Sequence, residues 1–118
     1  LTIISYGNGF YLSMKAMRKI EQKIHKKIKI IDLRWLTDIN YRKLIKEIEQ
    51  SKKILIVDEC RKSGCFGESI FNNISSSING IIKLHAAEDS FITIGESSNY
   101  TLPSEKSIAE EALALINA

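Results

Sequence analysis

The segment Ile54-Leu55-Ile56-Val57-Asp58-Glu59-Cys60-Arg61 decides the fold class of this chain. Its first four residues are aliphatic, with no polar residue between them. Such a continuous run is typical of a strand buried on both faces of a parallel sheet, because a strand with one solvated face alternates apolar and polar residues. The apolar run ends at Asp58, so we expect the strand Ile54–Val57 to be followed by a polar loop.

Three further runs predict strands, at Leu1–Ser5, Ile28–Leu33 and Ile81–Leu84. Apolar residues at helical spacing lie between and after them and predict helices, with stripes over Leu12–Ile24, Tyr41–Ile48, Ile70–Ile74 and Ile108–Ile116. Ser104 is the expected N-cap of the last helix. Strands that alternate with helices predict an α/β fold with a mostly parallel sheet in a three-layer α/β/α arrangement. The segment Ala86–Pro103 has no clear period, and long segments of this kind often bind a partner.

Length and composition indicate one domain over residues 1–118, without an internal boundary. Hydrophobic residues make up 44% and charged residues 26%, which argues against disorder and coiled coil. No apolar run approaches the roughly 20 residues that cross a bilayer, and no secretory signal is visible, so we expect a cytoplasmic protein with no membrane partner. Because the chain starts at Leu1 and runs directly into a strand, we expect it to be part of a longer polypeptide.

Charge is distributed unevenly along the chain. Residues 1–53 hold 13 Lys and Arg against 5 Asp and Glu, a net charge of +8, whereas residues 54–118 have a net charge of −5. The basic stretch Lys15–Lys29 is compatible with nucleic-acid binding. Lys is the main cation, however, and no aromatic residues for base stacking interleave with it. A solvated helix face is therefore favoured, and no nucleic-acid partner is expected.

The turn Gly7-Asn8-Gly9 follows the first strand and resembles part of a dinucleotide-binding fingerprint. Leu12 occupies the third glycine position, and the bulky Tyr6 and Phe10 flank the turn where the backbone would approach a pyrophosphate. The two glycines are better explained by a tight turn from strand to helix.

The polar residues after Val57 do not form a convincing active site. Asp58 and Glu59 are neighbours on an extended backbone and should point to opposite sides, so salt links to Arg61 and Arg34 or capping of nearby amides explain them better than acid–base catalysis. A nucleophilic Cys60 would need a base, for which His85 at the end of the fourth strand is the candidate at the same sheet edge. The spacing of Cys60 and Cys65 is a weak metal signal. We expect a positioning, assembly or partner-binding domain.

Six segments together resemble the C-terminal domain of the transketolase superfamily. The likeness is closest to the beta-type part of thiamine-diphosphate-dependent 2-oxo acid dehydrogenases, such as pyruvate and branched-chain 2-oxo acid dehydrogenase. The matching segments, in order, are Thr2–Gly9, Ile31–Leu36, Val57–Gly64, Phe66–Glu68, Ala86–Asp89 and Leu102–Ser104. Each is short, but together they span nearly the whole chain at spacings that fit one domain.

The resemblance implies an α/β/α domain that is itself inactive within an oxidoreductase. The family's domain has five strands, and its one antiparallel edge strand comes from just before the Leu1 segment, so we expect the sheet of this chain to be one strand short. Other domains of such enzymes hold thiamine diphosphate and magnesium, so no catalytic, cofactor or metal residue is carried over. The domain supports the catalytic core and its dimer and helps to dock the acyltransferase component. The expected interface residues lie at strand ends and are Tyr6, Asn8, Arg34, Asp58, Glu59, Arg61, Gly64, Phe66 and His85. The segments around Cys60 and Glu88 are most similar to enzymes in which both dehydrogenase subunits are fused.

Two alternatives remain open at this stage. One is a stand-alone binding module for RNA or protein, since anticodon-binding domains have a similar layered form; RNA binding would weaken steeply with salt. The other is a small enzyme that uses Cys60, for which thiol labelling near neutral pH would be fast.

Overall fold

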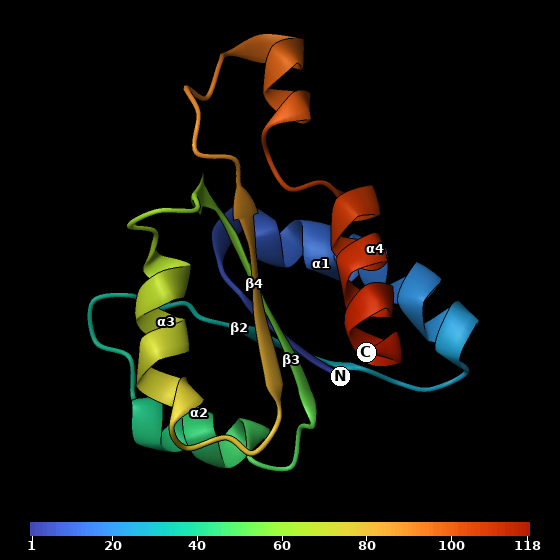
Figure 1. Cartoon of the computed structure of the whole chain (residues 1–118), viewed down its shortest axis with the longest axis vertical. Helices are drawn as coiled ribbons and strands as arrows, with labels where there is room; N and C mark the ends of the chain where they lie inside the picture. Colours follow the sequence, from blue (N-terminus) through green and yellow to red (C-terminus); the bar gives the residue numbers. More distant parts are fainter.

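The computed structural model describes residues 1–118 as four strands, four α-helices and one 3-10 helix (Figure 1). The strands are β1 (Thr2–Ser5), β2 (Lys29–Asp32), β3 (Lys53–Arg61) and β4 (Ile81–Ala87). The helices are α1 (Gly7–Ile24), α2 (Tyr41–Ile48), α3 (Phe66–Ser75), the 3-10 helix η1 (Gly95–Tyr100) and α4 (Glu105–Asn117). All eight predicted strands and helices are present, and none of the helices is long and apolar enough to cross a membrane.

The four strands form one sheet in the order β2-β1-β3-β4, and all its pairs are parallel. This confirms the predicted α/β class. The sheet has four strands, without the antiparallel edge strand that the resemblance places before the Leu1 segment. The order reverses at β1, because the chain goes first to β2 on one side and later to β3 on the other.

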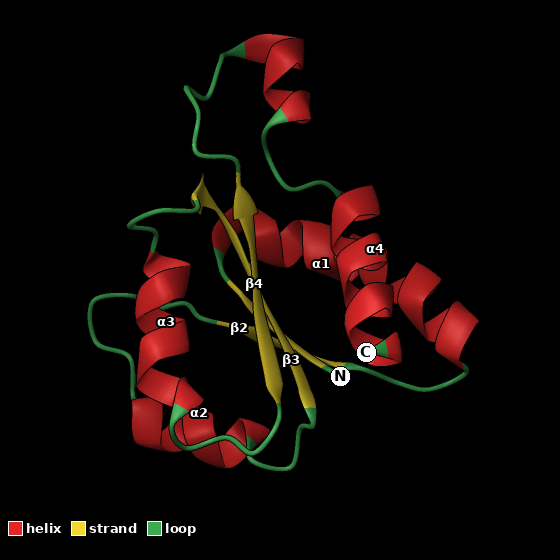
Figure 2. Ribbon diagram, viewed as in Figure 1, coloured by secondary structure: helices red, strands yellow, loops and turns green.

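Helices cover both faces of the sheet and complete the predicted three layers (Figure 2). Helices α1 and α4 pack on one face, where Ile3, Leu55 and Val57 meet residues such as Ile20 and Ile108. Helices α2 and α3 pack on the other face, where the alternate strand residues contribute to a second core of Ile4, Leu44, Ile48, Ile54, Ile56, Ile70, Ile74 and Ile78. Alternation along the strands thus divides a continuous aliphatic run between two cores.

Burial on both faces is found in the central strands but not along the whole sheet. β1 is buried throughout and β3 from Ile54 to Asp58, as the aliphatic runs predicted. The edge strands β2 and β4 are only partly buried, with Ile81 exposed, so the prediction of full burial is wrong for them. An edge strand has one neighbour, which leaves its outer side without cover from the next strand and the helix above it.

Two strands are longer than the hydrophobic pattern predicted. β3 continues past Val57 to Arg61, and β4 continues past Leu84 to Ala87. Val57 pairs with His85 and Arg61 pairs with Ala87, so β3 has an irregular stretch between the two pairs. Strands pair through backbone hydrogen bonds, so a strand can continue beyond its run of apolar side chains. The irregular stretch of β3 changes the direction of the side chains next to it.

Residues 88–103 leave the end of β4 and return to α4 as a projecting segment, which we call the arm (Figure 1). The backbone N–H of Glu88 donates to the carbonyl of Thr101 over 3.1 Å and closes the base of the arm. The Asp89 carboxylate accepts hydrogen bonds from the backbone and hydroxyl of Ser63, at 2.8 and 2.6 Å. The tip contains η1, which the sequence pattern did not predict.

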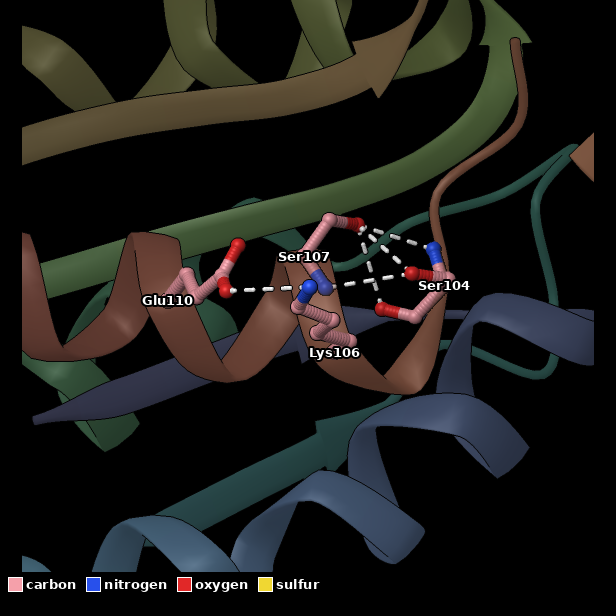
Figure 3. Close-up of polar contacts among 4 residues, drawn as sticks. All are labelled: Ser104, Lys106, Ser107 and Glu110. Carbon is pink, nitrogen blue, oxygen red and sulfur yellow. Dashed lines mark hydrogen bonds and ion pairs between the residues drawn. The ribbon is translucent and has the colours of Figure 1, made fainter. Parts of the chain in front are cut away.

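Helix α4 begins where Pro103 and Ser104 predicted it (Figure 3). The Ser104 hydroxyl accepts a hydrogen bond from the backbone N–H of Ser107 at 3.1 Å, and the Ser107 hydroxyl accepts one from the backbone N–H of Ser104 at 2.9 Å. This reciprocal pair is a capping box, which satisfies two N–H groups at the helix start. Ser104 is therefore the N-cap, as predicted.

Candidate interface at the carboxyl edge of the sheet

The carboxyl ends of β1 and β3 lie side by side at the point where the strand order reverses. In open α/β sheets this is where ligands and partner groups bind. The two strands pair from Thr2 with Ile54 to Ile4 with Ile56, and the Ser5 hydroxyl then donates to the carbonyl of Val57 at 2.8 Å. That bond joins the end of β1 to β3 just before Asp58, so the side chains that follow Ser5 and Val57 lie together at this edge.

Asp58 is the central buried polar residue of this edge. One carboxylate oxygen accepts the backbone N–H of Gly67 at 2.7 Å, and the other accepts that of Cys60 at 2.8 Å. The first bond satisfies an N–H in the first turn of α3, where a negative charge also meets the positive end of the helix dipole. Of the sequence-based explanations for Asp58, capping of nearby amides is therefore the correct one.

Tyr6 and Phe66 pack beside Asp58. Their ring centroids are 5.8 Å apart with the planes at 85°, an edge-to-face arrangement. Burial raises the pKa of the Tyr6 hydroxyl above its usual range, and the neighbouring Asp58 carboxylate raises it further. The hydroxyl therefore stays protonated, and it serves as a neutral polar group within an aromatic patch.

Asn8 and Glu59 form a second, exposed contact across the same two strand ends. The Asn8 amide donates to a Glu59 carboxylate oxygen at 2.6 Å. Because Asp58 is buried and caps α3 while Glu59 is partly exposed and contacts α1, the two carboxylates face different groups and form no dyad, as predicted.

The glycines of the first turn have structural roles. Gly7 has φ +54°, a conformation that favours glycine, and it starts α1 directly after Tyr6. Gly9 is buried, and a Cβ there would lie 2.6 Å from the Ser5 hydroxyl oxygen, so a side chain at this position would displace the hydroxyl that bonds to Val57. The geometry agrees with the tight-turn interpretation.

Cys60 and His85 do not form a nucleophile–base pair. The Nε2 atom of His85 lies 2.9 Å from the Ser107 hydroxyl of α4. Burial lowers the pKa of His85, which favours its neutral form. Partial burial of the Cys60 thiol raises its pKa, and the negative charge of Asp58 adds to this effect, so the thiolate is disfavoured at neutral pH. The geometry does not favour the small-enzyme alternative.

The remaining predicted interface residues lie around this cluster. Gly64 has φ +77° in the loop between β3 and α3, where its N–H donates to the Glu68 carboxylate at 2.7 Å. Arg61 is exposed and in no ion pair within the chain. Arg34 pairs with Asp32 at 3.0 Å after β2 rather than with Asp58. The structure thus brings Tyr6, Asp58 and Phe66 into one cluster and leaves Arg34 and His85 in contacts of their own.

This edge is suited to packing more than to chemistry. The oxygens of Asp58 are engaged by backbone amides, and no group of three or more His, Cys, Asp or Glu side chains lies together where it could hold a metal ion. The site therefore offers an aromatic patch with a polar rim, which is the composition of a surface that another domain covers.

Sequence reasoning did not single out several exposed apolar residues. Phe91, Ile94 and Tyr100 of the arm are 83%, 98% and 89% exposed, and Trp35 after β2 is 80% exposed. The sequence signal for the arm was the length of the segment Ala86–Pro103, which has no strand or helix period. No sequence signal marked Trp35 as exposed, because Trp side chains are on average highly buried.

Comparison with known proteins identifies the family. Residues 1–108 match the family described as the C-terminal domain of transketolase, and the chain belongs to that family. Among curated proteins, it is 27% identical over 120 residues to the pyruvate dehydrogenase E1 component subunit beta of Staphylococcus epidermidis, covering 98% of the chain and 37% of the relative. The corresponding subunit of Staphylococcus aureus is 26% identical over 116 residues, covering 95% of the chain and 35% of the relative.

Solved structures agree with the fold. A split-gene transketolase, described as an inactive beta4 tetramer, superposes with a TM-score of 0.77 at 16% identity, over 97% of the chain and 39% of its own. A flavodoxin-like domain from Synechococcus sp. superposes over the full length of both chains with a TM-score of 0.50 at 14% identity. At these identities the likeness shows the fold alone. The chain spans little more than a third of the length of the curated relatives it matches.

Proposed function

We propose that this chain is the non-catalytic C-terminal domain of a 2-oxo acid dehydrogenase, in the beta-type part of its thiamine-diphosphate-dependent decarboxylating component. Its roles are to support subunit assembly and to help dock the acyltransferase component. The observation that carries the proposal is the match over residues 1–108 together with pyruvate dehydrogenase E1 beta relatives that extend well beyond the matched part. The domain is one unit of a longer cytoplasmic polypeptide that forms a homo-oligomer.

The chemistry of the carboxyl edge supports a packing role. A metal-bound diphosphate needs free carboxylate and amide oxygens, whereas Asp58 uses both of its oxygens on backbone amides and Asn8 is bonded to Glu59. These residues do not fit thiamine diphosphate or magnesium. In this proposal, other domains of the parent enzyme bind both, and the Tyr6–Phe66 patch with Arg61 contacts the catalytic core.

The first test is the size of the native polypeptide, probed in extract with an antibody against this domain. A species much larger than 118 residues is expected, and 2-oxo acid decarboxylation should co-purify with it. A species of the size of this chain would contradict the proposal and favour a stand-alone binding module.

The second test is made in the whole parent enzyme. Substitution of Arg61→Glu together with Phe66→Leu removes an exposed cation and reshapes the aromatic patch. We expect weaker subunit assembly and lower activity together, because the core would lose its support. Arg42→Ala, an exposed arginine on α2, is the matched control and should change neither. Unchanged assembly and activity in the double variant would contradict the interface.

A further inference from the structure

Helix α1 carries a row of exposed cations, which we call the basic face. Lys15, Lys19 and Lys23 recur every fourth residue, so they lie along one side of the helix over about 12 Å. Arg18 adds a fourth cation, and the only acidic residue of the helix, Glu21, pairs with a lysine beyond the helix end. Like charges four residues apart repel each other and destabilise a helix. An anionic partner bound along the basic face would therefore stabilise α1.

The basic face is only partly neutralised within the chain. Lys19 pairs with Glu105 of α4 at 2.7 Å, whereas Lys15, Arg18 and Lys23 are in no ion pair. Helix α4 lies beside α1 on the same face of the sheet and supplies that single contact (Figure 1). The remaining positive charge is exposed to solvent, where a partner from outside the chain can reach it.

An apolar groove lies among these cations. It has a volume of about 560 Å³, and its apolar lining is Tyr11, Met14 and Met17, with Lys15 and Arg18 beside them. Tyr11 is 55% exposed and Met14 is 40% exposed. Met side chains are flexible and polarisable, so surfaces that contain them adapt to apolar side chains of different shape. A partner that matches this surface has both acidic and apolar residues.

We propose that the basic face of α1 docks an acidic segment of another protein, whose apolar side chains enter this groove. Charge complementarity favours this partner over a basic or neutral segment. Nucleic acid fits less well, because three of the four cations are Lys and the Lys15 ammonium lies 4.4 Å from the centre of the Tyr11 ring, over the face on which a base would stack. This inference goes beyond the proposed function and does not rest on it, since Tyr6, Phe66 and Arg61 are not part of the basic face.

The first test is fluorescence anisotropy with the 118-residue chain and a short fluorescein-labelled peptide in which pairs of Glu alternate with Leu and Phe. We expect saturable binding that weakens as the salt concentration rises. Two control peptides carry Gln in place of Glu, or Ser in place of Leu and Phe, and each should bind at least about tenfold more weakly. Equal binding of the Ser peptide would show that charge alone attracts the peptide, and would overturn the proposal.

Charge reversal then locates the docking site. Lys15→Glu with Arg18→Glu should weaken binding of the Glu/Leu/Phe peptide at least about tenfold. The matched control is Lys43→Glu with Lys46→Glu, which makes the same change of charge at the same spacing on the exposed side of α2, in the other helical layer. The control should weaken binding by less than about twofold, because those lysines are distant and screened by salt. Equal losses in the two double variants would assign binding to the net charge of the chain and overturn the proposal.

Spectroscopy and competition identify what occupies the face. In ¹H–¹⁵N spectra of the labelled chain, the peptide should shift the amides of Tyr11–Lys23 and leave those of α2 and α3 unchanged. A single-stranded oligonucleotide of equal charge should displace the labelled peptide less well than the unlabelled peptide does. An oligonucleotide that competes equally well or better would make the face a nucleic-acid site. A peptide affinity that falls as the chain concentration rises would show that a second copy covers it, and either result would overturn the proposal.

Discussion

At the scale of single residues, Asp58 organises the carboxyl edge. It is buried, and its two oxygens connect the end of β3 with the first turn of α3. Gly67 permits this approach, since a Cβ at that position would lie 2.5 Å from the Leu84 Cδ1 atom and 3.2 Å from an Asp58 oxygen. In the sequence, Asp58 lies where a catalytic carboxylate could be expected. In the structure, it accepts hydrogen bonds from backbone N–H groups.

Replacement of Asp58 by alanine should lower the free energy of unfolding by about 2–3 kcal/mol, because two backbone N–H groups lose their partner. The matched control is Glu59→Gln, which keeps an acceptor for Asn8 at a partly exposed position and should change the free energy by less than about 0.5 kcal/mol. Urea denaturation followed by circular dichroism measures both. Equal midpoints for Asp58→Ala and the unmodified chain would show that the two hydrogen bonds are not needed for stability.

At the scale of elements, the start of α4 connects two parts of the fold. Ser107 completes the capping box with Ser104 (Figure 3). Its hydroxyl also contacts His85 near the end of β4, at 2.9 Å from the Nε2 atom. The helix that covers one face of the sheet is thereby placed against the edge strand. Pro103 precedes the cap. It has no backbone N–H and therefore cannot donate a helical hydrogen bond.

Ser107→Ala should cost about 1–2 kcal/mol of unfolding free energy, because it removes the side-chain half of the capping box and the partner of His85. Lys106→Ala on the same turn is the control. Its ion pair with Glu110 is 3.9 Å long and exposed, so its loss should change stability by less than about 0.5 kcal/mol. Thermal or urea unfolding of both variants provides the comparison, and a larger loss for Lys106→Ala would contradict the importance of the cap.

At the scale of the whole molecule, two cores share one sheet. Ile3 and Ile4 are neighbours in β1, yet they contribute to opposite cores. Neither helical layer can therefore separate without exposing the same strands, and the domain should unfold as one cooperative unit.

Ile48→Ala in the α2/α3 core and Ile108→Ala in the α1/α4 core test this coupling. Each should lower the free energy of unfolding by about 2–5 kcal/mol, since each side chain is fully buried and leaves a cavity. Both variants should still show a single transition by circular dichroism and by amide hydrogen exchange. An intermediate that retains one helical layer would contradict the shared-core interpretation.

The sequence by itself determined the order of elements and the layering of this protein. The continuous aliphatic runs of the central strands favour strands covered on both sides, and helical stripes between the runs supply the cover, so local pattern and fold agree there. Family membership was also visible in the sequence, because short segments at strand ends keep their order and spacing.

Only the tertiary structure decided the rest. The extension of β3 and β4 depends on backbone pairing between strands, which side-chain hydrophobicity does not report. The capping role of Asp58 depends on the approach of Gly67, and the separation of His85 from Cys60 depends on which helix each strand end faces. The exposure of Phe91 and Ile94 depends on what surrounds the arm. Each of these is a contact between residues distant in the chain, and such contacts exist only once the sheet and its two layers have formed.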